Sequence, residues 1–275
     1  MYFELLSRLE PSLSRQRRYA SKIKRKTYII DSSIIPLCLS LFDWAKFRTK
    51  KRAIKLHAVL DYDSGLPNYA CISKGNLHDI DAARRVVFPP NSVVICDRAY
   101  VDYDWLNDLD STGVTFVTRV KSNAGYEVEK SWGVNEKYPH IISDKTIRLT
   151  TFQSKKKYPG PLRLVKVYDE ENDQYLSLLT NNMSWTANTI SVLYKAIWEI
   201  EVFFKHLKQL FRIKYFIGTS ANAVRIQMWS SMIVMLMLKY FQNIANFKWH
   251  LSNLVIFIRI NRLQNRISII GSIGR

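Results

Sequence analysis

Cysteine is scarce in this chain. Its 3 cysteines among 275 residues, Cys38, Cys71 and Cys96, are odd in number and show no C-x-x-C spacing. Disulfide frameworks and zinc sites need paired or closely spaced cysteines, so neither is indicated. The pattern fits a reducing compartment, and we expect a cytoplasmic protein.

Long hydrophobic runs are also missing. The longest, Met232 to Leu238, ends at Lys239 and is far shorter than the ~20 apolar residues of a membrane-spanning helix. No cationic segment followed by apolar and small residues opens the chain, which argues against an export signal. We therefore expect no membrane partner.

Acidic residues are the minority among the charged ones. The chain has 41 Lys and Arg against 23 Asp and Glu, a net charge of +18. This excess predicts a polyanionic partner, because each neutralised phosphate releases condensed counterions and adds affinity whatever the sequence. Double-stranded DNA is the natural candidate and would make the protein nucleoid-associated. A generally basic surface or an anionic membrane surface would also account for the charge.

The basic residues gather in three runs. They are residues 46–55, residues 155–157 and, on a predicted helix, Lys205, Lys208, Arg212 and Lys214. A row of cations is typical of a surface that holds phosphates, whereas a solvated helix face usually mixes both signs.

Composition and periodicity predict a globular α/β protein. The chain is 47% hydrophobic and 13% aromatic, and 275 residues approach the upper size for one hydrophobic core. Residues 26–120 predict three strands, a helix, a strand, a helix and a strand, a mixed sheet flanked by helices. Residues 121–185 predict a β-rich insertion, and residues 186–245 predict long helices. We expect a short basic arm over residues 1–25 and a helical tail with an irregular end over residues 246–275.

Two strand-like segments each carry an acid. Asp31 interrupts the β-branched and aromatic run over residues 26–35, and Asp97 lies in a similar run over residues 92–100. Such runs suit strands covered on both faces, where a carboxylate is costly unless it is paired or binds a cation. Both acids are therefore candidate metal ligands, although a strand-borne Asp can also cap a turn through backbone hydrogen bonds.

A third acid belongs to a helix predicted over residues 189–211. Tyr194, Glu201 and Lys208 are spaced by seven, nearly two turns, so they share one stripe. The opposite stripe is apolar and consists of Leu193, Ile200, Phe204, Leu207 and Phe211. Glu201 is thus a rigidly held carboxylate beside the core, as a metal site requires. An ordinary helix with solvated Glu and Lys gives the same pattern.

Several stretches in a fixed order carry a family resemblance. They are Ile30-Asp31-Ser32-Ser33, Trp44 to Arg48, Cys96 to Tyr100, Trp198 to Lys205 and Phe216 to Arg225. Together they resemble the DDE transposases of bacterial insertion sequences, in the family-four branch whose third motif reads Tyr-x-x-Arg-x-x-x-Glu-x-x-x-x-x-x-Lys. The resemblance covers residues 26 to 245.

The resemblance implies an RNase H-like (retroviral integrase-like) core that cuts and joins DNA. It implies Asp31, Asp97 and Glu201 as catalytic residues that hold two Mg²⁺ ions, with Mn²⁺ tolerated, since hard oxygen ligands favour these ions. Tyr194 and Lys208 would hold the transposon-end phosphate. The further implied DNA contacts are Arg98, Lys205, Arg212 and Asn222. The implied partners are transposon ends and target DNA, and a homodimer could form in a synaptic complex.

The chain departs from the family pattern at several places. The third-motif Arg falls on Ile197, which cannot contact a phosphate, and Ala99 stands where a Gly usually follows the second Asp-Arg pair. The helical region that precedes the first acid in the family is mostly missing, and residues 269–275 show no periodic face. We therefore expect a shortened or frame-shifted copy with weak or absent transposition and retained metal binding.

Three functions stay open. The chain is interpreted as a transposase, and the alternatives are a non-catalytic DNA-binding remnant and a general metal-dependent DNA nuclease. The three acids speak against the remnant, and the third motif together with the Asn222 region speaks against the general nuclease. His57 and the pair His78-Asp79 are interpreted as structural hydrogen-bonding groups rather than acid-base catalysts.

Overall fold

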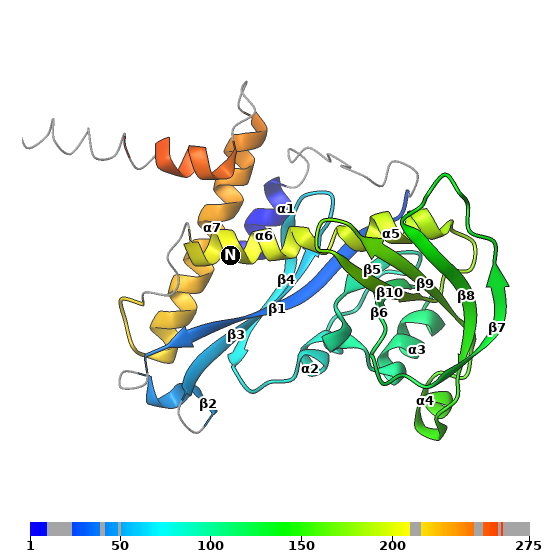
Figure 1. The fold of residues 1–275 in the computed structure, drawn as a ribbon. Helices are drawn as coiled ribbons and strands as arrows, with labels where there is room; N and C mark the ends of the chain where they lie inside the picture. The colour runs from blue at the N-terminus through cyan, green and yellow to red at the C-terminus, as the bar shows by residue number, and fades with distance from the viewer. Residues whose placement is uncertain are drawn as a thin grey trace, which may run out of the picture.

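One sheet of ten strands runs through the described part of the chain (Figure 1). The computed structural model describes residues 1–9, 24–38, 42–48, 51–209, 216–244, 250–257 and 260. The strands are β1 (Thr27–Leu37), β2 (Lys46–Arg48), β3 (Lys51–Asp61), β4 (Leu66–Lys74), β5 (Val93–Cys96), β6 (Thr115–Arg119), β7 (Tyr126–Trp132), β8 (Ile141–Leu149), β9 (Leu162–Asp169) and β10 (Gln174–Thr180).

The strand order is β2-β3-β1-β5-β6-β10-β9-β8-β7, and β4 also pairs with β3. The pairs β1-β5 and β5-β6 are parallel, and the other strand pairs are antiparallel. The fold is thus mixed α/β, with a large and mostly antiparallel sheet. The order expected over residues 26–120 is confirmed, with β2 as an additional strand.

Helices flank this sheet on both sides. They are α1 (Tyr2–Leu9), α2 (Asp79–Ala83), α3 (Tyr103–Ser111), α4 (Phe152–Lys157), α5 (Ala187–Lys195), α6 (Trp198–Gln209) and α7 (Ala221–Ile244), with 3₁₀ turns η2 (Asp43–Ala45) and η3 (Arg98–Tyr100). Apolar side chains of α1, α5, α6 and α7 pack on one face, called the α6 face here. Those of α2, η3 and α3 pack on the other, the α3 face.

The alternation of β1 shows how the sequence builds both cores. Ile29 and Ile35 pack on the α6 face, whereas Tyr28 and Ile30 pack on the α3 face. Side chains alternate along a strand, so an apolar run without polar interruption supplies two faces at once. All four of these side chains are buried.

Turn and cap residues fix where the elements end. Gly65, with φ +63°, closes the β3-β4 hairpin, and Gly113, with φ +74°, follows α3. Both need the left-handed conformation that glycine adopts without strain. Asp102 caps α3 by accepting a hydrogen bond from the Trp105 amide, as N-cap side chains do.

The β-rich insertion predicted over residues 121–185 contains β7 to β10 and, in addition, the short helix α4. β7 is the last strand of the sheet order and its side chains are exposed on both faces, so burial imposes no apolar pattern on it. The insertion also extends the central sheet, because β10 pairs with β6. Of the helical tail expected over residues 246–275, the structure describes residues 250–257 and 260.

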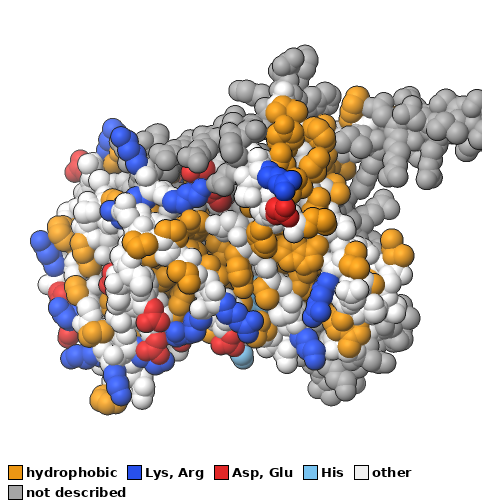
Figure 2. Space-filling view, turned by 180° about the vertical axis from the view of Figure 1, so that it is seen from behind, with side chains coloured by type: hydrophobic (Ala, Val, Ile, Leu, Met, Phe, Trp, Pro, Cys, Tyr) orange, Lys and Arg blue, Asp and Glu red, His pale blue; other side chains and the backbone are white. Residues whose placement is uncertain are grey.

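α7 is apolar on much of its surface. In the part of the chain that the structure describes, it is the one helix long and apolar enough to cross a membrane, and 39% of its most apolar stretch is buried. Its exposed hydrophobic side chains gather on the surface in Figure 2 and include Ile226, Val234, Phe241 and Ile244. A single helix of this kind is a weak indication of a membrane span, because core helices pass the same test, and Met228 and Met232 lie in the core.

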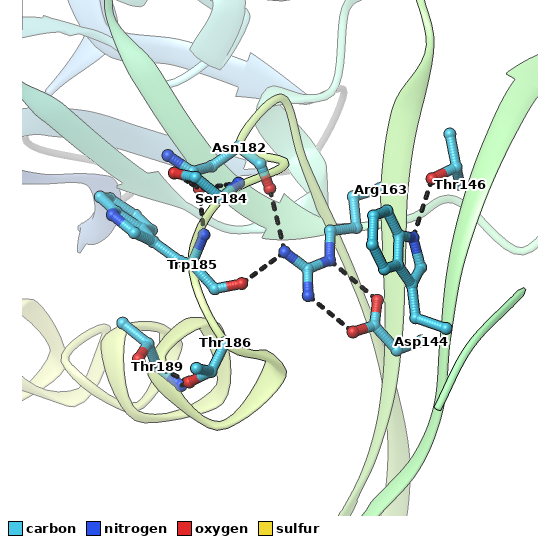
Figure 3. Close-up of polar contacts among 9 residues, drawn as sticks. Asp144, Thr146, Arg163, Asn182, Ser184, Trp185, Thr186 and Thr189 are labelled. Carbon is cyan, nitrogen blue, oxygen red and sulfur yellow. Dashed lines mark hydrogen bonds and ion pairs between the residues drawn. The ribbon is translucent and has the colours of Figure 1, made fainter. Parts of the chain in front are cut away.

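A buried ion pair fastens the insertion to the start of α5 (Figure 3). Asp144 of β8 and Arg163 of β9 are each 5% exposed, and Arg163 Nε and Nη2 donate to the two carboxylate oxygens at 2.8 and 2.6 Å. Arg163 Nη1 donates to the Trp185 carbonyl at 2.5 Å and to the Asn182 carbonyl at 3.4 Å. Thr186, the next residue, caps α5. The guanidinium therefore holds the turn from which α5 begins.

Arg163→Met should lower the free energy of unfolding by about 3–5 kcal/mol, because it leaves the Asp144 carboxylate buried without its partner. Denaturant unfolding followed by circular dichroism measures the loss. Arg148→Met is the control: it breaks the exposed pair with Glu129 and should cost no more than about 1 kcal/mol. Equal losses in the two variants would contradict the role given to Arg163.

Candidate active site

Asp31 of β1 lies beside Asp97, the residue that directly follows β5. β1 and β5 pair in parallel with Ile30 opposite Cys96, so the two acids are the next residues in this register. Asp97 keeps an extended backbone, with φ −78° and ψ 168°. Asp31 lies two residues after Ile29, and Asp97 lies two residues after Ile95. Both isoleucines pack on the α6 face, and residues two apart in an extended chain point to the same side. Two carboxylates therefore face the side of the sheet that α6 covers.

Glu201 belongs to the first turn of α6, which contacts β1. Ile200, Phe204 and Leu207 are buried beneath the helix, as predicted, while Glu201 is exposed. Phe211, the last residue of the predicted apolar stripe, lies outside the described residues. Packing of the apolar stripe thus holds the third carboxylate above the other two.

The three acids affect one another's ionisation. The pKa of Asp31 is raised from 3.8 to about 7, chiefly by burial. A backbone hydrogen bond at Ser32 opposes this rise, and the carboxylates of Asp97, Asp79 and Glu201 add to it. Burial, and then Asp97, raises the pKa of Glu201. Removal from water and repulsion between like charges both disfavour the ionised form. The site concentrates negative charge that a cation would relieve.

The donors suit a divalent cation, although they are not closed around one. Asp97 Oδ1 is buried and has no hydrogen-bond partner. Carboxylate oxygens are the hard ligands that Mg²⁺ and Mn²⁺ prefer. Within the described residues, no three His, Cys, Asp or Glu side chains gather tightly enough to form a complete metal site. The three carboxylates are chemically suited to a divalent metal ion, while the distances between them are larger than those in a closed metal site.

The single helix predicted over residues 189–211 is wrong, because α5 and α6 are separate. The amides of Ala196 and Ile197 donate to carbonyls three residues back instead of four. This tighter turn changes the phase of the helix, so a spacing of seven no longer keeps side chains on one stripe. Tyr194 is 6% exposed and buried, whereas Glu201 is exposed and Lys208 is half-buried.

Arg119 joins the acids although the sequence analysis did not select it. β5 and β6 pair in parallel with Ile95 opposite Val117, so Arg119 follows Asp97 in the same row. The Arg119 guanidinium lies close enough to the Tyr194 hydroxyl to favour its ionised form. Burial raises the pKa of that hydroxyl, Asp97 raises it further, and Arg119 opposes the change. One feature of the sequence could have indicated Arg119: it is a cation at the carboxyl end of β6, and β6 runs parallel to β5, which Asp97 follows.

The other predicted DNA contacts are spread over the surface. Arg98 is exposed next to Asp97, and Lys205 is exposed one turn after Glu201 on α6. Asn222 is exposed in the first turn of α7, and Arg212 lies outside the described residues.

The structure does not bring Asn222 to the acids. Just before α7, the Thr219 carbonyl accepts a hydrogen bond from Trp44 Nε1, which places this segment near η2 and beyond the end of β1. β1 continues to Leu37, roughly 20 Å past Asp31 at the rise of an extended strand. Asn222 is thus separated from the carboxylates by most of β1.

A family comparison agrees with this arrangement of acids. The family model described as the transposase DDE domain matches residues 22–237, more than half of the chain, and this range contains all three carboxylates. The chain belongs to the DDE transposase family.

Relatives in this family are named as transposases. Transposase y4zB of Sinorhizobium fredii is 33% identical over 242 residues, 87% of this chain and 67% of that protein. A transposase for insertion sequence element IS5377 of Geobacillus stearothermophilus is 24% identical over 237 residues, 86% of this chain and 62% of that protein. A transposase for insertion sequence element IS4SA of Synechocystis is 23% identical over 247 residues, 87% of this chain and 67% of that protein.

The chain thus spans about two thirds of the length of these relatives. Resemblance to insertion-sequence DDE transposases is confirmed, and the family-four branch stays a prediction. Among solved structures, the cryo-EM structure of a piggyBac transposase synaptic complex with hairpin DNA has a TM-score of 0.49 and 11% identity, covering 83% of this chain and 50% of that one. A likeness at this level is too weak to support an argument.

Asp31→Asn should stabilise the metal-free protein at pH 8. The pKa of Asp31 in the folded protein, about 7, lies above its ordinary value of 3.8, so folding favours the protonated acid. That stabilisation is complete below pH 3.8 and is lost as the pH rises through 7. The variant should gain at most about 4 kcal/mol over the wild type at pH 8 and less at pH 5. Denaturant unfolding of the wild type and the variant, with a chelator present at both pH values, measures the difference in the free energy of unfolding. An equal difference at the two pH values would contradict the raised pKa of Asp31.

Proposed function

We propose that this protein is an insertion-sequence transposase that cleaves and rejoins DNA at the ends of its element with Mg²⁺ or Mn²⁺. The observation that supports this most is the placement of Asp31 and Asp97 on neighbouring parallel strands, facing the helix that carries Glu201. Membership of the DDE transposase family supports the reaction class. The element order β1-β3-β4-α2-β5-α3-β6 supports an RNase H-like core.

The three carboxylates would hold the metal ions. Two bound divalent ions would supply Lewis-acid activation of the attacking hydroxyl and charge stabilisation at the leaving oxygen of the phosphodiester. The protein contributes a rigid support: the β1-β5 ladder fixes Asp31 and Asp97, and the buried side of α6 fixes Glu201. Asp97 Oδ1, which lacks a hydrogen-bond partner, is the donor most ready to bind a cation.

Basic side chains around the acids would hold the DNA backbone. Arg98 and Lys205 are exposed close to Asp97 and Glu201 along the chain. Tyr194 is buried against Arg119, so we propose that the pair acts together, with the tyrosine orienting the guanidinium beside the acids. Ile197 is partly buried against the core and offers no charge at the motif position, which supports reduced transposition by this chain.

End cleavage is the direct test of the proposed reaction. A supercoiled plasmid carrying the element's ends is incubated with Mg²⁺, Mn²⁺ or chelator and with wild type, Asp97→Ala or Glu136→Ala. Glu136 is an exposed acid outside the site and serves as the control. We expect metal-dependent nicking at the ends by wild type and control and none by Asp97→Ala.

The other outcomes separate the alternatives. Salt-sensitive DNA binding without any nicking would make the protein a DNA-binding remnant of a transposase. Metal-dependent nicking that ignores the ends would make it a general nuclease.

Arg119→Ala should reduce end cleavage by roughly tenfold or more, because a hydrogen bond from a charged donor contributes about 1.5–3 kcal/mol. Lys121→Ala removes an exposed cation two residues further on and should change little. Cleavage rates at saturating DNA, with binding measured separately by fluorescence anisotropy, distinguish a role at the acids from general attraction of DNA. Equal effects of the two substitutions would refute the role of Arg119.

A further inference from the structure

A second polar cluster lies directly behind the acid-bearing strand, on the α3 face. Ser32 follows Asp31 on β1, so its side chain projects to the opposite side of the sheet. Its hydroxyl donates to Asp79 Oδ1, at the start of α2, at 2.5 Å. Lys55 Nζ of β3 donates to the same oxygen at 3.2 Å, and His57 Nδ1 of β3 lies 3.6 Å from it. Three side chains from two strands thus surround one carboxylate oxygen.

The two β3 members of the cluster are buried, because Lys55 is 9% exposed and His57 is 2% exposed. Ser32 and Asp79 are half-buried. Lys55 Nζ also donates to the Leu77 carbonyl at 3.1 Å, and His57 Nε2 shares a hydrogen bond with Ser73 at 3.0 Å. Burial lowers the pKa of His57 to about 4, so the imidazole is neutral and the charged pair is Lys55 with Asp79. A half-satisfied buried cluster is costly, so these groups have little freedom to rearrange.

The strand register explains what the cluster holds. β1 and β3 pair with Ser32 opposite His57 and Ile34 opposite Lys55. Asp79 therefore bonds to both strands at the level of Ser32, and α2 also contacts β1. Ser32 and Asp31 share a rigid peptide unit, so a bond that holds Ser32 in place also restrains the backbone that carries Asp31.

We propose that Asp79 is a positioning residue for the metal-binding acid Asp31, acting through the Ser32 hydroxyl from the face of the sheet opposite the metal. The inference rests on the proposed function, because it assigns Asp31 to the metal. Groups that orient metal ligands typically change metal affinity by 10–100-fold when removed. Asp79 has the geometry for this role because it reaches the adjacent residue without occupying the metal site.

A double-mutant cycle on Mn²⁺ binding tests the route of action. The full chain is compared as wild type, Asp79→Ala, Ser32→Ala and the combination, with free Mn²⁺ measured by electron paramagnetic resonance. Each single variant should raise the Kd for Mn²⁺ by about tenfold, and the combination should be no weaker than the weaker single variant. Additive effects would mean that Asp79 does not act through Ser32 and would overturn the proposal.

Two further variants control for charge and for the hydrogen bond. Asp81→Ala removes an exposed acid two residues along the same helix and should leave the Kd unchanged. Asp79→Asn keeps an oxygen that can accept from Ser32 and should recover part of the affinity.

The double variant Lys55→Met with Asp79→Ala distinguishes a loss of Mn²⁺ affinity caused by reduced stability from one caused by lost positioning of Asp31. This variant removes the buried cation that the single substitution leaves unpaired, so the unfolding temperature should recover. The Kd for Mn²⁺ should stay raised. A Kd that returns to the wild-type value together with stability would show a purely structural role and overturn the proposal.

Failure of the proposed function has a different signature. If the wild type binds no Mn²⁺, the metal-dependent function falls, and amide hydrogen exchange of β1 then decides the positioning role without metal. Asp79→Ala and Ser32→Ala should speed exchange in the peptide that covers residues 27–37, and Asp81→Ala should not. Unchanged exchange in all variants would overturn the link between Asp79 and the acid strand.

Discussion

Parallel pairing of β1, β5 and β6 sets Asp31, Asp97 and Arg119 in one row across the sheet, and most other features of the molecule maintain that row. A shift of the register by one residue would turn every side chain of a strand to the opposite face. Because β1 packs into a core on each face, such a shift would move Ile29 and Ile30 into each other's core and turn Asp31 away from Asp97. The apolar packing of these strands therefore offsets the unfavourable free energy of holding the Asp31 and Asp97 carboxyl groups next to each other.

Support for the acids comes from three directions. From the α6 face, buried side chains of α6 hold Glu201 over the sheet. From the α3 face, Asp79 ties β1 and β3 to α2. From the insertion, Arg163 fixes the turn where α5 begins, and α5 carries Tyr194 to Arg119. The first support is apolar packing, and the other two are polar contacts made inside the protein.

The local sequence pattern predicted most strands and helices of the core, but it did not predict which strands pair with each other. The strands around Asp31 and Asp97 were predicted because β-branched runs are a local signal. Arg119 was missed because its place beside Asp97 depends on which strands pair, which no single segment shows. The interruption at Ala196 and Ile197 was missed because neither residue is a helix breaker. Tyr194 was expected to share one stripe with Glu201 and Lys208 because that interruption was missed.

The insertion separates the first two acids from the third along the chain, so they leave the ribosome at different times. β6 joins the insertion through β10, and Glu201 follows β10 in the chain. A ribosome-bound chain that has released β1, β5 and β6 already holds two of the acids, yet the helix with the third is still unmade. A chain that ends before α6 therefore cannot assemble all three carboxylates, so the site is complete only after the insertion has been made.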